Sequence, residues 1–326
     1  MADYPMTNPD SDFISVVVPV FQEGEALQTF LASVRHVLSQ SGVSYELILV
    51  DDGSSDKTWS VITEEAKGSS QLLGYRLSRN FGKEAALCAG LEKARGAAVI
   101  VMDGDGQHPA SLLPEMIRMW RATGADIVQA VKRSRGPESF SSKAGAALFY
   151  VLLEKLSGYH LKGASDFKLM SRKAVDAWLG MGERNVFFRG MTAWMGFTTV
   201  QIPFEVAQRA RGQSTWSYLK RLKLAITGIT AFSSLPLQLV TFAGAFFLVF
   251  SVILGAQTLY LKLIGEAVSG FTTVILLELI IGSFLMISLG IIGEYLGRIY
   301  REVKGRPRYL VTDSTDTARA LDKGSD

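Results

Sequence analysis

The chain has 326 residues, enough for one sizeable domain and additional elements. Its 34 basic and 31 acidic residues nearly balance, and so small a net charge argues against binding nucleic acid through bulk electrostatics. A single cysteine, Cys88, excludes an intramolecular disulfide and is consistent with a domain in the reducing cytosol.

Short apolar runs alternate with helical patterns after a polar segment, residues 1–12, which lacks the basic region of a secretory signal. Strands are expected at Ile14–Val20, Glu46–Val50, Leu72–Leu77, Ala97–Met102 and Asp126–Val131. Helices are expected between them at Glu25–Ser39, Lys57–Ala66, Lys83–Ala94 and Pro109–Thr123, the last with Pro109 in its first turn. This alternation predicts an α/β fold with an open, doubly wound sheet, which binds ligands beyond the carboxyl ends of its strands.

Two further helices are expected before the most apolar part of the chain. Lys143–Tyr159 is apolar over most of its circumference, and both interfacial and ordinary core packing remain open for it. Trp216–Ile229 carries Lys220 and Arg221 opposite an apolar side. That pattern favours an amphipathic helix lying in a membrane interface.

Two long stretches lack the charges that a soluble surface would carry. Ala225–Leu261 has no charged residue, and Ala267–Gly293 has only Glu278. A bilayer core of about 30 Å needs roughly 20 apolar residues as helix, so two transmembrane helices are predicted, near Leu237–Leu261 and Phe271–Gly293. The alternative is a pair of buried helices in a soluble protein. Glu278 is expected to act in assembly, since a charge inside a membrane usually faces protein or water.

The flanks of these stretches set their orientation. Basic residues precede the first stretch and follow the second, and the connection between them carries only Lys262 and Glu266. The positive-inside rule predicts that both termini and the large domain lie on the cytoplasmic side of the inner membrane. The expected organisation is a polar segment at 1–12, a catalytic domain at 13–215, an interfacial helix at 216–234, a two-helix membrane region at 235–300 and a cytoplasmic tail at 301–326.

Acidic residues follow three of the predicted strands and meet at one edge of the sheet. Clustered carboxylates raise one another's pKa unless a cation compensates. Asp103 and Asp105, with Gln107 as a neutral oxygen, are therefore candidate ligands of Mg²⁺ or Mn²⁺. An acidic turn is the alternative. Asp51 is placed to contact a ribose or base, whereas Asp56 is expected to cap the following helix.

Four segments resemble successive signatures of family 2 glycosyltransferases of the GT-A fold, which is Rossmann-like: SVVVPVFQEG (15–24), ELILVDDGSSDKT (46–58), NFGKEAAL (80–87) and VMDGDGQHP (101–109). Within that family the chain resembles polyprenyl-phosphate glycosyltransferases, which include dolichol-phosphate mannose synthases and bactoprenol glucosyltransferases. The resemblance covers roughly Phe13–Tyr300, with both apolar stretches. The commoner form of the last segment is DADLQHP. Here both variable positions are glycine, which keeps the ligands and is expected to loosen the loop. His108 is expected to be a loop residue, not a ligand.

The resemblance implies roles for particular residues. Those for the nucleotide-sugar are Pro19, Glu23, Asp51, Lys83 and Asp103; those for the metal and diphosphate are Asp103, Asp105 and Gln107. The segment GASDFKLMSR (163–172) resembles the acceptor-side motif, which makes Asp166, with Asp105, the catalytic candidate. The segment RARGQSTWS (209–217) resembles the phosphate-binding loop. It implicates Arg209, Arg211 and Ser214 in holding the acceptor, with Lys168 as a further contact.

The expected reaction is the transfer of a sugar to a polyprenyl phosphate with inversion at the anomeric carbon. The expected sugar is glucose, with UDP-glucose as its donor. A phosphate monoester is nearly a dianion at neutral pH, so Asp166 need not act as a base. Mannose from GDP-mannose and a modified arabinose remain open as the sugar. A processive polysaccharide synthase is a rival, although two spans are few and its GlnXXArgTrp signature is absent. A non-catalytic membrane scaffold is another. The resemblance also suggests a homo-oligomer, with a tetramer as the expected state.

Overall fold

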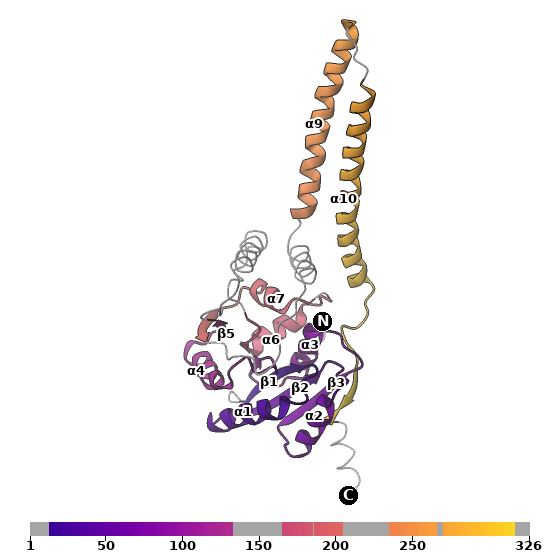
Figure 1. Ribbon diagram of the computed structural model, residues 1–326. Coiled ribbons are helices and arrows are strands. Elements are labelled where there is room, and N and C mark those ends of the chain that lie inside the picture. The colour runs from indigo at the N-terminus through magenta and orange to yellow at the C-terminus, as the bar shows by residue number, and fades with distance from the viewer. Residues whose placement is uncertain (1–12, 133–164, 185, 205–234, 266–269, 317–326) are drawn as a thin grey trace. The chain divides into compact units, whose positions relative to one another are not determined.

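The computed structural model describes residues 13–132, 165–184, 186–204, 235–265 and 270–316 (Figure 1). These residues fall into two units. One is a sheet-centred domain that includes the described residues up to 204 and those from 307 onward. The other comprises two long apolar helices.

The domain is built on a mixed sheet of eight strands in the order β7-β5-β6-β4-β1-β2-β3-β8. Their bounds are β1 Phe13–Val20, β2 Ser44–Asp51, β3 Leu72–Leu77, β4 Ala98–Val101, β5 Ile127–Lys132, β6 Lys168–Ser171, β7 Thr199–Phe204 and β8 Val311–Ser314. All five predicted strands are present with small shifts at their ends. The other three, β6, β7 and β8, were not predicted.

The central strands β4, β1, β2 and β3 run parallel, as the almost continuous apolar sequences of β1, β2 and β4 indicate. In contrast, β6 lies antiparallel between β4 and β5, and β8 lies antiparallel on the outer edge of β3. The sheet is therefore mixed, with a parallel centre. That centre places the carboxyl ends of β1, β2 and β4 beside one another.

Helices cover both faces of the sheet, which confirms the doubly wound arrangement (Figure 1). Alternate residues of a strand point to opposite faces, so Val16 and Val18 pack in one core and Val17 in the other. The first core includes residues of α1 Leu27–Gln40, α2 Thr58–Lys67 and α4 Leu113–Thr123. The second includes residues of α3 Lys83–Lys93, α6 Arg172–Gly180 and α7 Phe188–Trp194.

One helix start differs from its prediction. Pro109 is extended and precedes a short 3-10 turn at Ala110–Leu112, and α4 begins only at Leu113. Pro114 occupies the first turn of α4, where its missing N–H leaves no gap in the helix. The proline that the helix accommodates is thus Pro114.

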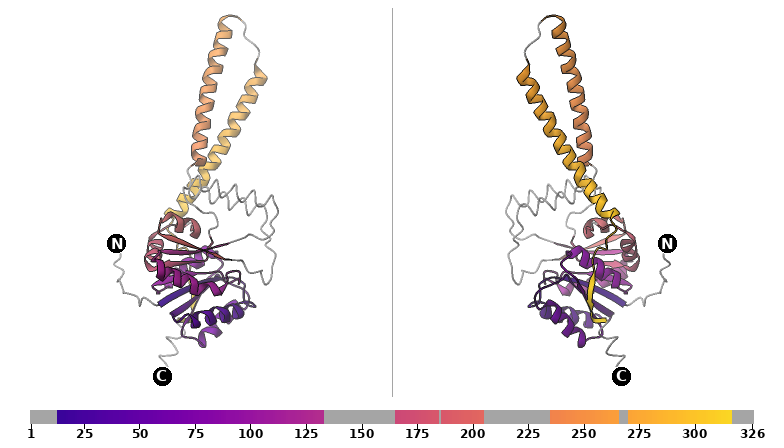
Figure 2. Two further views of the ribbon diagram at one scale, coloured as in Figure 1. Left: turned by 90° about the vertical axis from the view of Figure 1, so that its left-hand side faces the viewer. Right: turned by 90° about the vertical axis from the view of Figure 1, so that its right-hand side faces the viewer.

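The segment after the second apolar helix returns to the sheet. β8 pairs with β3, and the Gly74 N–H donates to Thr315 Oγ1 at 2.9 Å. The Tyr75 hydroxyl donates to Asp316 at 2.6 Å, and Arg308 Nη2 donates to the Met181 carbonyl at 2.7 Å. Figure 2 shows this segment, coloured yellow, against the domain.

The second unit consists of α9 Leu235–Leu263 and α10 Phe271–Val303. Each contains a stretch long and apolar enough to cross a membrane, Leu237–Leu263 in α9 and Leu277–Val303 in α10. In the most apolar 18 residues of these stretches, 0% and 6% of the residues are buried. Core helices of a soluble protein would be covered, so this exposure favours membrane spans over the soluble alternative. The helices predicted at 143–159 and 216–229 lie outside the described residues.

Candidate active site

A cavity of about 300 Å³ lies at the carboxyl ends of β1, β2 and β4. It is lined by Pro19, Val20, Phe21, Glu23, Asp52, Asn80, Gly82, Lys83, Asp103, Gly104 and Asp105. Five residues that the sequence predicted for the donor or the metal are among them: Pro19, Glu23, Lys83, Asp103 and Asp105. The topology thus brings together side chains from three acidic loops and the start of α3.

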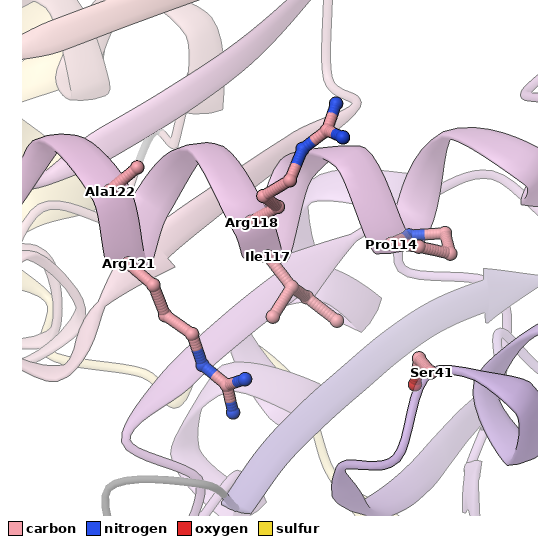
Figure 3. A pocket seen from close by; sticks show the side chains of 6 residues that line it. All are labelled: Ser41, Pro114, Ile117, Arg118, Arg121 and Ala122. Carbon is pink, nitrogen blue, oxygen red and sulfur yellow. The ribbon is translucent and has the colours of Figure 1, made fainter.

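A larger hollow of about 390 Å³ lies elsewhere on the domain, between the end of α1 and α4 (Figure 3). Its six lining residues include Ser41, Arg118 and Arg121, and none of the six is a carboxylate. It lies away from the carboxyl ends of the parallel strands, where ligands of such sheets bind. We therefore assign the active site to the acidic cavity.

The two aspartates at the end of β2 have different surroundings. Asp51 is fully buried: its Oδ1 accepts from the Ser54 N–H at 2.9 Å, and its Oδ2 lies 3.4 Å from Arg76 Nε. Asp52 lines the cavity and accepts from the N–H groups of Phe81 and Gly82 at 2.7 and 2.9 Å. Burial raises the pKa of Asp52, and these two N–H groups oppose the rise. Asp52, and not Asp51, therefore holds the loop that leads into α3.

Two other loop residues do not line the cavity but make contacts within the loops around it. Asp56 accepts from the Thr58 N–H at 3.0 Å just before α2 and from the Gly24 N–H at 3.1 Å. The N-cap of α2 is Lys57, which makes no side-chain cap bond, so Asp56 lies one residue before the position expected for it. His108 is buried, and its Nδ1 accepts from the Asp103 N–H at 3.0 Å. His108 thus supports the acidic loop from within.

Both glycines of the acidic loop suit its shape. A methyl group on Gly104 would lie 2.7 Å from Val20 Cγ1, and Gly106 has a φ of +73°, a conformation that favours glycine. The Gln107 N–H donates to Asp105 Oδ1 at 3.0 Å, which closes the turn. Gln107 does not line the cavity, so its role as a metal ligand stays a prediction.

The carboxylates of this loop fit a divalent cation, provided that a ligand completes the site. In the described part of the chain, no three His, Cys, Asp or Glu side chains gather as a metal cluster. Asp103 Oδ1 is shielded from solvent, and its partner among the described residues is the Lys83 ammonium at 2.5 Å. Mg²⁺ commonly takes one or two carboxylates together with substrate phosphates. Asp103 and Asp105 match that donor set.

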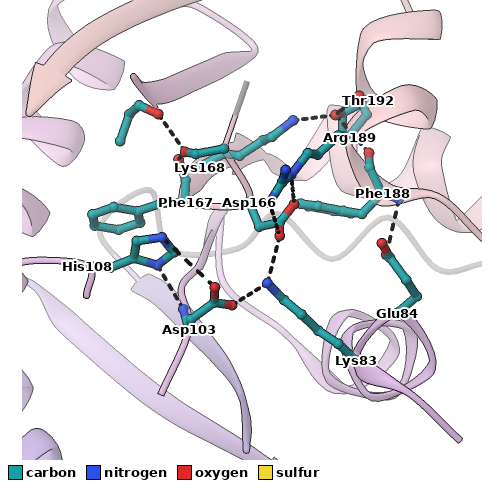
Figure 4. Close-up of polar contacts among 12 residues, drawn as sticks. Lys83, Glu84, Asp103, His108, Asp166, Phe167, Lys168, Phe188, Arg189 and Thr192 are labelled. Carbon is teal, nitrogen blue, oxygen red and sulfur yellow. Dashed lines mark hydrogen bonds and ion pairs between the residues drawn. The ribbon is translucent and has the colours of Figure 1, made fainter. Parts of the chain in front are cut away.

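Asp166, 6% exposed, lies at the centre of a charged cluster (Figure 4). Arg189 contacts both of its oxygens, Nε at 2.7 Å and Nη2 at 2.8 Å. Lys83 Nζ lies 2.6 Å from Asp166 Oδ2 and 2.5 Å from Asp103 Oδ1. Burial alone would raise the pKa of Asp166, but the bonds and charge of Arg189 and the charge of Lys83 outweigh it and hold that pKa well below its usual range. Asp166 is therefore an anion at neutral pH.

The surroundings of α7 fix Arg189 in place. Glu84, next to Lys83 on α3, accepts from the Phe188 N–H at 3.1 Å at the start of α7. Lys168 is 2% exposed, and its ammonium donates to Thr192 on the same helix and lies 5.2 Å from the centre of the Phe188 ring. Burial lowers the pKa of Lys168 to about 8. The Lys168 ammonium is thus enclosed in the described structure, and its contact with the acceptor stays a prediction.

Sequence reasoning missed Arg189, Glu84 and Asp52 as parts of this site. Arg189 lies in a segment, AsnValPhePheArgGly, that carries no catalytic signature, and an isolated arginine is usually a solvated surface residue. Asp52 was visible beside Asp51, but its orientation was not. The predicted acceptor residues Arg209, Arg211 and Ser214 lie outside the described residues.

Comparisons with known proteins agree on the type of domain. Residues 15–179 match the family model described as "Glycosyl transferase family 2". An uncharacterized glycosyltransferase of Synechocystis sp. is 40% identical over 92% of this chain and 95% of its own length. An SfII prophage-derived bactoprenol glucosyl transferase of Shigella flexneri is 38% identical over 92% of this chain and 98% of its own length. A prophage bactoprenol glucosyl transferase homolog of Escherichia coli is 37% identical over 91% of this chain and 98% of its own length.

Among solved structures, a mannosyltransferase of Pyrobaculum calidifontis in complex with GDP-Man and Mn²⁺ has a similar fold. The similarity covers 67% of this chain and 63% of the mannosyltransferase chain. The sequence identity is 17% and the TM-score 0.48. So distant a likeness carries no information about ligands. The sequence relatives, which match nearly end to end, are the informative comparison.

Proposed function

Because the chain belongs to glycosyl transferase family 2 and is therefore a glycosyltransferase, we propose that it transfers glucose from UDP-glucose to a polyprenyl phosphate, with inversion at the anomeric carbon. The observation that carries the proposal is the combination, in one chain, of an acidic cavity at the sheet edge and two exposed apolar helices. Relatives named as bactoprenol glucosyl transferases match more than nine-tenths of this chain and support the same acceptor.

In this proposal the cavity holds the donor. Pro19, Glu23 and Asp51 would serve the nucleoside, although Asp51 would have to become accessible from its buried position. Asp103 and Asp105, with Gln107, would hold Mg²⁺ or Mn²⁺, which supplies positive charge to the departing nucleotide diphosphate. Lys83 reaches the same region from the start of α3.

Asp166 acts in the proposal as a fixed anion that orients the reacting groups. Two observations favour this role over that of a general base. Both of its oxygens are engaged by Arg189 and one also by Lys83, and its pKa lies far below neutrality. The acceptor phosphate brings its own negative charge and has no proton that must be removed before attack. Asp166→Asn should therefore keep donor binding and lose most turnover.

The acceptor would approach from the membrane. Arg209, Arg211 and Ser214 remain the proposed contacts of its phosphate. The basic residues that flank α9 and α10 favour a cytoplasmic active site and cytoplasmic termini. We also propose a homo-oligomer, with a tetramer as the expected state and Glu278 in its assembly. Chemical cross-linking of the Glu278→Gln variant tests this, and an unchanged subunit number would exclude a role for Glu278.

The test uses the full chain in vesicles that contain polyprenyl phosphate, with Mn²⁺ and radiolabelled UDP-glucose or GDP-mannose in separate arms. The expected product is a lipid that carries one glucose and is absent when EDTA is added. Asp103→Asn should abolish it, and Arg118→Met, on the distant hollow, should not. A labelled mannolipid would identify the mannose alternative, and a polymer would identify a processive synthase. No product with any donor would contradict the proposed function.

A further inference from the structure

Lys83 joins the two acidic parts of the active site. Its ammonium lies 2.5 Å from Asp103 Oδ1 and 2.6 Å from Asp166 Oδ2 (Figure 4). Its position is fixed through the backbone, because Asp52 binds the two N–H groups that precede it in the chain. The side chain is 37% exposed and lines the cavity. Lys83 can therefore move into the cavity without unpacking the core.

The two carboxylates depend on Lys83 to different degrees. Asp166 keeps both hydrogen bonds from Arg189 if Lys83 leaves. Asp103 has no such second cation close by: in the described structure the other basic side chain near it is His108, with Nε2 at 4.0 Å from Oδ2, and the Nδ1 of that ring accepts a hydrogen bond as in a neutral imidazole. Removal of Lys83 would leave the Asp103 carboxylate half-buried and poorly compensated, a costly state for an anion. Lys83 is thus the principal counterion of Asp103.

Asp103 is also the residue best placed to bind a divalent cation. The oxygen Asp103 Oδ1 that could bind such a cation is the one that the Lys83 ammonium contacts at 2.5 Å. The two cations would repel each other and compete for one oxygen. Lys83 therefore opposes metal binding at Asp103 Oδ1 for as long as it keeps this contact.

The number of carboxylates limits what the metal gains from the protein alone. Asp103 and Asp105 are two ligands, and the remaining positions would be taken by water or by phosphate oxygens. A nucleoside diphosphate supplies such oxygens. It also offers the displaced ammonium a negative partner in place of Asp103 and in addition to Asp166, since Lys83 already lies at the wall of the same cavity.

We propose that Lys83 is an exchangeable counterion of Asp103, which suppresses metal binding in the empty site and moves to the diphosphate when metal and nucleotide arrive together. The inference rests on the proposed function, because it needs a nucleoside diphosphate donor. Its consequence is thermodynamic coupling: nucleotide strengthens metal binding, and metal strengthens nucleotide binding by the same factor.

The experiment measures Mn²⁺ binding to the full chain in detergent, from the electron paramagnetic resonance signal of free Mn²⁺, with and without UDP. In the wild type, UDP should strengthen Mn²⁺ binding by at least about tenfold. Lys83→Met should tighten Mn²⁺ binding without UDP by about tenfold, because the competing ammonium is gone. The same variant should lose most of the effect of UDP.

Three further variants sharpen the result. Lys83→Gln is measured in parallel, so that the conclusion does not depend on the folding of one variant. Lys83→Arg keeps the charge and should leave Mn²⁺ binding without UDP weak. Lys67→Met, an exposed lysine on α2 that pairs with Glu64, is the matched control and should behave as the wild type.

Two outcomes would contradict the inference, and they differ in what else they contradict. If the wild type binds Mn²⁺ with UDP but the Lys83→Met and Lys83→Gln variants bind Mn²⁺ alone no more tightly than it does, the counterion role is wrong and the proposed function stands. If no protein binds Mn²⁺ even with UDP, the metal and nucleotide parts of the proposed function fail, and the inference fails with them.

Discussion

Replacement of Arg189 by methionine would test the arrangement around Asp166 most directly. Methionine keeps much of the apolar length of the side chain but removes both contacts with Asp166, at 2.7 and 2.8 Å. Hydrogen bonds to charged groups contribute about 1.5–3 kcal/mol each. Because the Arg189 side chain is 36% exposed, solvent replaces part of this interaction, and we expect a net loss of about 2 kcal/mol. If the transition state needs Asp166 in this orientation, that loss corresponds to a roughly 30-fold fall in kcat.

The assay is steady-state formation of the glycosylated lipid, with kcat and KM determined separately for the donor. A positioning role predicts a fall in kcat with little change in KM, because Arg189 does not line the donor cavity. Arg189→Lys should recover only part of the activity, since an ammonium cannot make the paired contact. Arg118→Met is the control for loss of an arginine. A kcat for Arg189→Met within twofold of the wild type, in folded protein, would refute the reasoning.

Two other predictions concern stability, measured as the melting temperature in detergent. A methyl group at Gly90 would lie 2.3 Å from Val17 Cγ1, so Gly90→Ala should reduce the stability by about 2 kcal/mol. Gly68→Ala is the control and should be neutral, because no atom lies nearer than 3.9 Å to the added methyl group. Equal effects of the two substitutions would contradict this prediction. Burial, with the nearby Asp166 charge, raises the pKa of Glu84 from 4.5 to about 7. Its ionisation therefore destabilises the fold as pH rises through that interval. Glu84→Gln should accordingly stabilise the protein more at pH 8 than at pH 5, and a pH-independent difference would exclude this origin.

The sequence predicted the centre of the fold because the strands there are buried on both faces. Val16 to Val18 and Leu47 to Val50 are apolar at every position, so the pattern needs no knowledge of neighbours. The missed strands have weaker patterns. β7 is largely exposed, and β8 is a short polar strand whose extended form depends on pairing with β3. Such strands follow from tertiary contacts, which a local pattern does not contain.

The acidic loops were predictable because a parallel sheet gathers the carboxyl ends of its strands. The details were not. A difference of one position decides whether a side chain faces the core or the cavity, and it turned Asp51 toward Arg76 and Asp52 toward the cavity loop. The pairing of Asp166, which precedes β6, with Arg189 on α7 bridges a stretch of chain that contains both β6 and α6. No spacing rule for a helix or strand encodes that contact.

The position of β8 in the chain has a consequence for biosynthesis. On the ribosome, β3 is completed roughly 230 residues before β8, which at about 5–20 residues per second is a delay on the order of 10–50 s. During that time the outer edge of β3 has no partner and is a site for mispairing with other chains. The sheet closes only after both apolar helices have been translated. Completion of the domain is thereby tied to synthesis of the two apolar helices. A nascent chain that stalls before β8 exposes an open strand edge to chaperones and proteases.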